Sequence, residues 1–172
     1  MIIIDDFLSE GEFKDLMTVD EHWQNSLRYS WHEGKATEES SHWAQFAYYV
    51  WNVTFKPPYD YDGFEYWTNA LVAGGRNDLP WHFDKDEHLW ATTNKVLSPT
   101  HGLVYYSHKK MPKGGYLEIE RDGELERIQP VPNRLIIFDP SVKHRVTPIH
   151  EGVRRTFASN VWMKKPSEEN FI

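Results

Sequence analysis

The chain has 172 residues, of which 26 are acidic and 19 basic, and its formal net charge is −7. This length predicts a single domain over residues 1–172 with a sizeable core. The absence of cysteine excludes disulfides and thiolate metal sites, so any metal must be held by His, Asp or Glu. The acidic balance makes nucleic acid an unlikely partner. Without a signal-peptide pattern or a long apolar stretch, we expect a cytoplasmic protein that does not cross a membrane.

The first part of the chain, residues 1–56, is expected to form a helical support for the rest. Residues 5–18 are predicted to be a helix, because Ser9 and Glu12 have the spacing of a capping box. Residues 41–52 carry apolar side chains at helical spacing and are predicted to form a second helix.

After Lys56-Pro57-Pro58 the pattern changes to short β-rich runs separated by Gly, Pro and Asp. Arg121-Asp122-Gly123-Glu124 is a strong hairpin signal. About eight short strands after a helical start predict a mainly β (α+β) fold, either two packed sheets or a jelly roll, whose core spans residues 64–163. The expected strands are 64–72, 81–84, 102–107, 115–121, 124–129, 134–138, 142–147 and 153–163.

The run Trp81-His82-Phe83-Asp84 carries the first two candidate metal ligands. Side chains of an extended segment repeat every two residues, so His82 and Asp84 are expected to share one face. A third ligand would complete a two-His-one-carboxylate face, which is the geometry of non-haem Fe(II) oxygenases. We choose His144, which follows an apolar strand and a Pro turn. The other histidines lack metal-ligand spacing and are expected at the surface or in loops: His22, His32, His42, His88, His101, His108 and His150.

Arg154 lies ten residues beyond His144 and is the candidate for binding a co-substrate. A guanidinium can hold a carboxylate through two parallel hydrogen bonds, and a contact of this kind contributes about 1.5–3 kcal/mol. An inward arginine beside a metal with open positions implies a carboxylate that also ligates the metal, as 2-oxoglutarate does. Arg155 is the rival, and Arg154 is preferred because strand parity points it with Thr156 and Ala158.

These residues resemble the Fe(II)/2-oxoglutarate-dependent oxygenases, in particular the prolyl 4-hydroxylase branch. The resemblance covers residues 64–163, and the start of the chain, Ile4-Asp5-Asp6-Phe7-Leu8-Ser9, is also similar to that branch. The matching elements, in chain order, are His82-Phe83-Asp84, Gly102-Leu103-Val104-Tyr105-Tyr106, Gly114-Gly115-Tyr116-Leu117-Glu118-Ile119, Asn133-Arg134-Leu135-Ile136-Ile137-Phe138, His144-Arg145-Val146-Thr147-Pro148 and Gly152-Val153-Arg154.

The resemblance implies a cupin-like double-stranded β-helix with a defined cofactor set. It implies that His82, Asp84 and His144 bind Fe(II) and that Arg154 binds the distal carboxylate of 2-oxoglutarate. By the same resemblance, Tyr106 hydrogen-bonds that carboxylate. The implied enzyme is a dioxygenase that uses O2, with ascorbate as an optional reductant, to hydroxylate an aliphatic C–H with release of succinate and CO2.

The substrate is left open between several alternatives. The branch implies a peptidyl proline or an amino-acid-like substrate, and a free small metabolite is the alternative. A cupin-like module that binds metal without oxidation belongs to a different class, and the acidic charge disfavours a demethylase of nucleic-acid bases. Specificity is expected to lie in loops. These loops are residues 19–40, 85–101 and 107–113.

Overall fold

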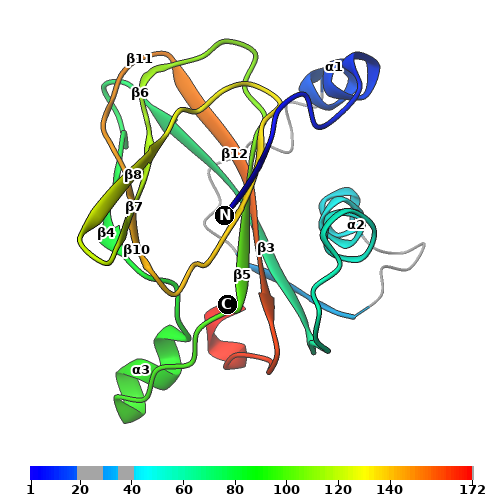
Figure 1. Cartoon of the computed structure of the whole chain (residues 1–172), viewed down its shortest axis with the longest axis vertical. Coiled ribbons are helices and arrows are strands. Elements are labelled where there is room, and N and C mark those ends of the chain that lie inside the picture. The colour runs from blue at the N-terminus through cyan, green and yellow to red at the C-terminus, as the bar shows by residue number, and fades with distance from the viewer. Residues whose placement is uncertain (19–28, 35–40, 172) are drawn as a thin grey trace.

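The computed structural model describes residues 1–18, 29–34 and 41–171, and β-strands dominate it (Figure 1). Within these ranges the strands form a six-stranded sheet (β1-β9-β5-β12-β3-β2), a four-stranded sheet (β4-β10-β7-β8) and a two-stranded sheet (β11-β6). The fold is the predicted jelly roll with helices packed against it. The strands are β1 (Ile2–Ile4), β2 (Ser30–Glu33), β3 (Gly63–Val72), β4 (Leu79–His82), β5 (His101–Tyr106), β6 (Lys113–Gly114), β7 (Leu117–Arg121), β8 (Glu124–Ile128), β9 (Leu135–Phe138), β10 (Lys143–Val146), β11 (Ile149–Glu151) and β12 (Val153–Trp162).

Each of the eight predicted β-runs overlaps a strand, and the Asp122-Gly123 hairpin joins β7 to β8 as expected. The prediction missed β1, β2, β6 and β11. The segment 19–40 was expected to be irregular, but its described part, Ser30–Glu33, is β2 and pairs with β3. The remainder of that segment, including His22, lies outside the described residues.

The helices begin and end differently from the prediction. The first helix, α1 (Glu10–Thr18), does not start at residue 5, because the backbone N–H groups of Phe7 and Leu8 donate to Asn133 and Ser9 caps the helix. Its capping box is confirmed: Ser9 N donates to Glu12 Oε2 over 3.0 Å. The second helix is α2 (His42–Tyr49), and the chain then continues as a π-helix, Val50–Phe55. Among the described residues, no helix is long and apolar enough to span a membrane.

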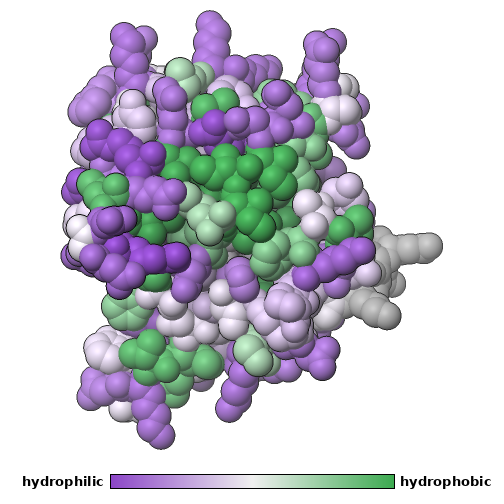
Figure 2. All heavy atoms as spheres, viewed as in Figure 1, coloured by the Kyte–Doolittle hydropathy of each residue, from purple (hydrophilic) through white to green (hydrophobic). Residues whose placement is uncertain are grey.

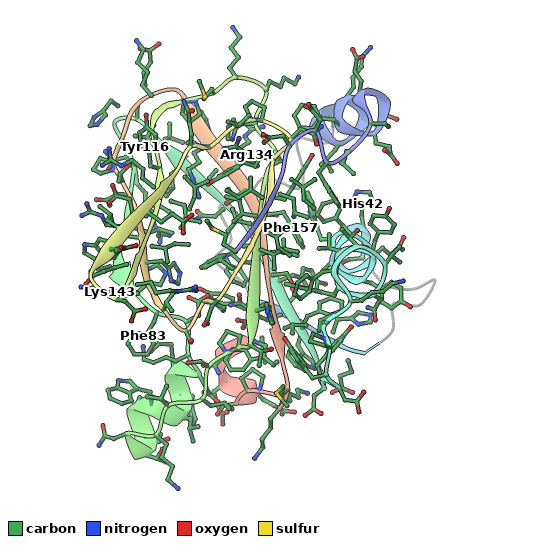
Figure 3. All side chains as sticks on the ribbon, viewed as in Figure 1. His42, Phe83, Tyr116, Arg134, Lys143 and Phe157 are labelled. Carbon is green, nitrogen blue, oxygen red and sulfur yellow. The ribbon has the colours of Figure 1, made fainter. Side chains whose placement is uncertain are left out.

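Strand β12 separates two hydrophobic cores because its side chains alternate between the two faces of the sheet. Phe157 faces α2, where its ring stacks on Trp43 at a centroid distance of 4.7 Å (Figure 3). On the same face, Trp51 Nε1 donates to Ser159 Oγ over 3.0 Å. The other face of β12, which carries Arg154, is turned toward the four-stranded sheet and forms one wall of the cavity between the sheets. The helices therefore support the sheet from outside and leave its inner face to the site.

The N-terminal strand β1 extends the six-stranded sheet at the edge beside β9. Its outer residues Ile2 and Ile3 are exposed, and a hydrophobic patch lies over this part of the molecule (Figure 2). The connection from β1 to α1 is fixed by Asn133, whose side chain exchanges hydrogen bonds of 3.0 and 2.8 Å with the backbone of Leu8. Asn133 Oδ1 also accepts from the buried Tyr105 hydroxyl over 2.9 Å.

Replacing Asn133 by alanine is expected to lower the free energy of unfolding by about 2–4 kcal/mol, because it removes three hydrogen bonds and leaves a buried hydroxyl without a partner. Urea denaturation measures this loss. Asn133 has a positive φ of 59°, so Asn94→Ala, at an exposed residue with φ 57°, is the matched control for backbone strain alone. If both variants lose the same stability, the side-chain bonds of Asn133 contribute nothing measurable.

A short helix, α3 (Glu87–Thr93), and a 3-10 helix, η3 (Glu168–Phe171), lie together at one end of the jelly roll (Figure 1). Asp86 connects them: its Oδ1 accepts from Leu89 N over 2.9 Å and its Oδ2 from Ser167 N over 2.7 Å. The predicted loop 85–101 therefore contains a helix. The residues after α3 remain without regular structure up to β5.

Candidate metal centre

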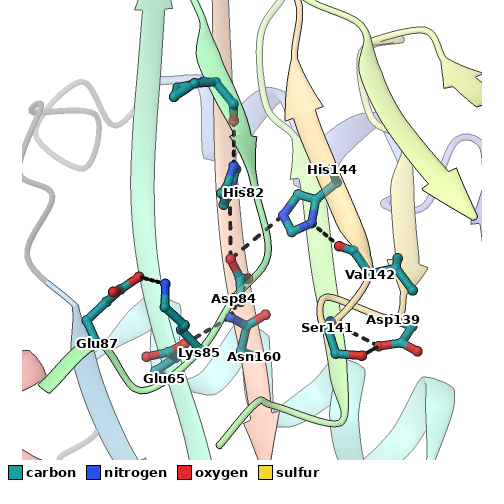
Figure 4. Close-up of polar contacts among 11 residues, drawn as sticks. Glu65, His82, Asp84, Lys85, Glu87, Asp139, Ser141, Val142, His144 and Asn160 are labelled. Carbon is teal, nitrogen blue, oxygen red and sulfur yellow. Dashed lines mark hydrogen bonds and ion pairs between the residues drawn. The ribbon is translucent and has the colours of Figure 1, made fainter. Parts of the chain in front are cut away.

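The three predicted metal ligands lie together between β4 and β10. His82 and His144 are directly opposite each other in the antiparallel pair, and their ring centroids are 4.3 Å apart. Each Nε2 lies 3.7 Å from Asp84 Oδ1, and one ligand atom from each residue falls within 4.8 Å of the others (Figure 4). Two imidazoles and one carboxylate thus converge on one point.

Backbone carbonyls orient both imidazole rings. His82 Nδ1 lies 2.7 Å from Pro80 O, and His144 Nδ1 lies 2.8 Å from Val142 O. An Nδ1–H that donates to a carbonyl fixes the tautomer in which the Nε2 lone pair is free to bind a metal. Both free nitrogens then face Asp84. The arrangement is that of two oriented metal ligands.

Asp84 lies past the end of β4, although residues 81–84 were predicted to be one strand. Asp84 makes no strand pairing, and two hydrogen bonds fix its position. Its backbone N–H donates to Pro140 O over 2.9 Å, which ties it to the turn that precedes His144. Its Oδ2 accepts from Asn160 Nδ2 over 2.9 Å, which leaves Oδ1 pointing at the two histidines.

Burial differs across the three residues. His144 is only 5% exposed, and this burial lowers the pKa of its imidazole, against the opposing effect of Asp84. The neutral form, which binds metals, is therefore favoured at His144. The side chains of His82 and Asp84 are 38% and 21% exposed. They line a pocket of about 480 Å³, so one side of the centre is open to a ligand.

A second, smaller cavity of about 60 Å³ runs from the same three residues to Arg154. Arg154 is 2% exposed, and its Cζ lies 5.0 Å from the centre of the Tyr106 ring. Arg154 Nε and the Tyr106 hydroxyl are both buried without a hydrogen-bond partner. A buried unpaired polar group costs about 1–3 kcal/mol, so the unpaired Arg154 Nε at this cavity and the unpaired hydroxyl of the neighbouring Tyr106 fit an acceptor such as the carboxylate of 2-oxoglutarate.

Arg155 points away from this cavity. It lines a separate groove on the other side of β12, beside Lys109 and Lys110. Of the two rival arginines, the structure brings only Arg154 to the cavity that also contains the triad. The alternation of side chains along β12 is the reason.

Two polar residues of the site were missed by the sequence reasoning. Asn160 of β12 and Glu65 of β3 are buried, face each other in the strand register, and lie next to Asp84. For both residues the sequence pattern indicated an inward-facing position. Asn160 has the same parity as Arg154, and Glu65 is an acid between apolar neighbours in a predicted strand.

A jelly roll that presents two histidines and one carboxylate, with an open side, defines the class of non-haem iron oxygenases. The family model described as the 2OG-Fe(II) oxygenase superfamily matches residues 66–164, more than half of the chain, and the chain belongs to this superfamily. It is therefore a 2-oxoglutarate-dependent oxygenase that uses Fe(II), 2-oxoglutarate and O2.

Solved structures of prolyl hydroxylases share the fold. A Pseudomonas putida prolyl-4-hydroxylase is 15% identical, with a TM-score of 0.62 over 95% of this chain and 92% of that one. A collagen prolyl hydroxylase of Paramecium Bursaria Chlorella virus-1, solved with 2-oxoglutarate, is 18% identical, with a TM-score of 0.60 over 95% and 96%. A Trichoplax adhaerens prolyl hydroxylase, solved with a hypoxia inducible factor peptide fragment, is 14% identical, with a TM-score of 0.56 over 94% and 82%. No curated protein sequence matches the chain.

Proposed function

We propose that the protein hydroxylates an aliphatic C–H of a peptidyl proline or an amino-acid-like substrate. In this proposal His82, Asp84 and His144 hold Fe(II), and Arg154 with Tyr106 holds the distal carboxylate of 2-oxoglutarate. The observation that carries the proposal is that two cavities share His82 and Asp84: a small one that also contains the buried Arg154 and a larger one that can admit a substrate. When bound, Fe(II) and 2-oxoglutarate supply the activation of O2, with succinate and CO2 as co-products.

The chain's own residues have separate tasks in this reaction. Arg154 and Tyr106 bind and orient the co-substrate from a buried position, where water cannot compete for their hydrogen bonds. Asn160 holds Asp84 so that Oδ1 faces the histidines. The partial exposure of His82 leaves the pocket side free for the carbon to be hydroxylated.

Two observations support an amino-acid or peptidyl substrate. The open pocket of about 480 Å³ is in the range that accepts a small ligand or one side chain of a peptide. Prolyl hydroxylases are among the similar structures, and one of them was solved with a peptide. The alternative is the same chemistry on another free small metabolite. A non-oxidative cupin-like module is not supported, because the chain belongs to an oxygenase family.

The test is a coupled assay in air with Fe(II), 2-oxoglutarate and ascorbate. Proline-containing peptides, free amino acids and small metabolites unrelated to amino acids are offered separately, and each product is analysed by mass spectrometry. We expect one set to gain a single oxygen atom in step with succinate release, and omission of 2-oxoglutarate is the control. Oxygen gain only in compounds unrelated to amino acids would refute the substrate class while leaving the oxygenase reaction intact.

A further inference from the structure

One buried acid in the open pocket has no role in binding iron or 2-oxoglutarate. Glu65 of β3 is 7% exposed, and its Oε1 accepts a hydrogen bond from Asn160 Nδ2 over 2.9 Å (Figure 4). The same amide donates to Asp84 Oδ2, so Glu65 is joined to an iron-ligand candidate through one side chain. Glu65 also lines the open pocket. It is therefore placed beside the position where a substrate would lie.

The carboxyl group of Glu65 has no cation beside it in the described part of the chain, where no Lys, Arg or His forms an ion pair with it. Two cations line the same pocket: Lys85, whose Nζ lies 2.7 Å from Glu87 Oε1, and Arg76, which forms no ion pair with Glu65. Burial raises the pKa of Glu65 to about 8. Near neutral pH the acid is therefore mostly protonated in the free protein, and a cation brought by a ligand stabilises the carboxylate and releases the proton to solvent.

Aromatic side chains surround this acid. Trp67 lies two residues along β3 and so shares the face of Glu65, and its ring centroid is 4.8 Å from that of Tyr29. Trp162 of β12 also lines the pocket, and its indole acts on Glu65 directly, lowering the pKa of that acid against the larger effect of burial. Tyr29 interacts electrostatically with Glu65: its pKa is raised to about 12, first by burial and then by the Glu65 charge. Aromatic faces attract cations, so the tryptophan side chains and Glu65 both favour a positively charged ligand.

We propose that Glu65, Trp67 and Trp162 bind a cationic nitrogen of the substrate, the side-chain ammonium or guanidinium group of an amino-acid-like molecule. This inference rests on the proposed function and specifies its substrate class. It selects an amino-acid-like substrate with a basic group over an uncharged peptidyl proline. Binding of the cation at Glu65 places the carbons next to it beside the open side of the metal centre.

Binding is tested by calorimetry without oxygen, on the full chain loaded with Fe(II) and 2-oxoglutarate. The probes are two pairs that match in shape and differ in charge: L-lysine with L-norleucine, and L-arginine with L-citrulline. Each is used free and as its N-acetyl amide, which distinguishes a free amino acid from a residue in a peptide. We expect the cationic member of at least one pair to bind about tenfold more tightly or better, in one of these two forms.

The variant Glu65→Gln keeps the size of the side chain and its acceptor oxygen for Asn160 but cannot ionise to a carboxylate when a cation binds. We expect it to bind both members of the pair within about twofold of each other, because the electrostatic attraction is lost. Its absorption with Fe(II) and 2-oxoglutarate should match that of the wild type. Glu87→Gln, at an exposed acid of the same pocket, is the matched control and should keep the preference.

The proposal is overturned if the wild type binds charged and neutral members equally, if no cationic probe binds, or if Glu65→Gln keeps the preference. These outcomes are separate from a failure of the proposed function. A wild-type protein that gives no spectral change with Fe(II) and 2-oxoglutarate fails at the metal centre, before the substrate pocket is tested.

Discussion

Replacing Arg154 by glutamine is expected to weaken 2-oxoglutarate binding about 10- to 150-fold and to abolish turnover at ordinary co-substrate concentrations. The range corresponds to the loss of charged hydrogen bonds worth about 1.5–3 kcal/mol. Arg154 is buried, its Nε has no hydrogen-bond partner, and among the described residues it is the only Arg or Lys that lines this cavity. No other cation there can bind the carboxylate in its place. Iron binding should be retained. The measurement is the 2-oxoglutarate concentration dependence of the anaerobic Fe(II) absorption.

The adjacent residue is the control for this prediction. Arg155→Gln alters the same strand on its other face and should leave the affinity for 2-oxoglutarate unchanged. Tyr106→Phe removes one neutral donor beside Arg154 and should weaken binding only about 2- to 10-fold. A larger effect at Arg155 than at Arg154 would show that the co-substrate binds on the opposite side of β12.

Asp84→Asn is expected to reduce Fe(II) affinity at least about 100-fold and to remove activity, since a neutral amide is a poor substitute for the only carboxylate of the triad. The change preserves the size of the side chain. It also preserves the backbone bond from residue 84 to Pro140 O, so the turn should stay in place. Equilibrium dialysis of Fe(II) without oxygen, together with succinate release in air, measures both effects.

Asp122→Asn is the matched control for this loss. Asp122 lies in the exposed β7–β8 hairpin with a φ of 54°, which asparagine accepts, so iron affinity and activity should not change. Retention of full iron affinity by Asp84→Asn would exclude the carboxylate from the metal centre and require another acid in its place.

The residues of the candidate site were predictable because their chemistry is unusual and their spacing is regular. A His and an Asp two residues apart, a later His and an inward Arg together indicate an iron site with a carboxylate co-substrate. In the structure all four residues line the same cavity between the sheets. Glu65 and Asn160 were not predicted, because a single acid or amide in a strand carries no meaning until its partner across the sheet is known.

The missed elements of the fold depend on contacts between distant parts of the chain. Ile2–Ile4 form a strand because β9 offers an edge. The next residues, Phe7 and Leu8, are hydrogen-bonded to Asn133, so α1 begins only at Glu10. Helix α3 has no buried residue and hence no apolar stripe to reveal it. It is held instead by its Asp86 cap and by the bonds of Asp86 to the segment around η3. Local patterns cannot report such pairings.

The most direct test of the account is the anaerobic absorption of the protein with Fe(II), with and without 2-oxoglutarate. Binding of both to the triad and Arg154 predicts a charge-transfer band that appears only when the metal and the co-substrate are present together, and that saturates at one equivalent of each. Metal binding with no change on addition of 2-oxoglutarate would contradict the account, because it would leave Arg154 and the inner cavity without a ligand.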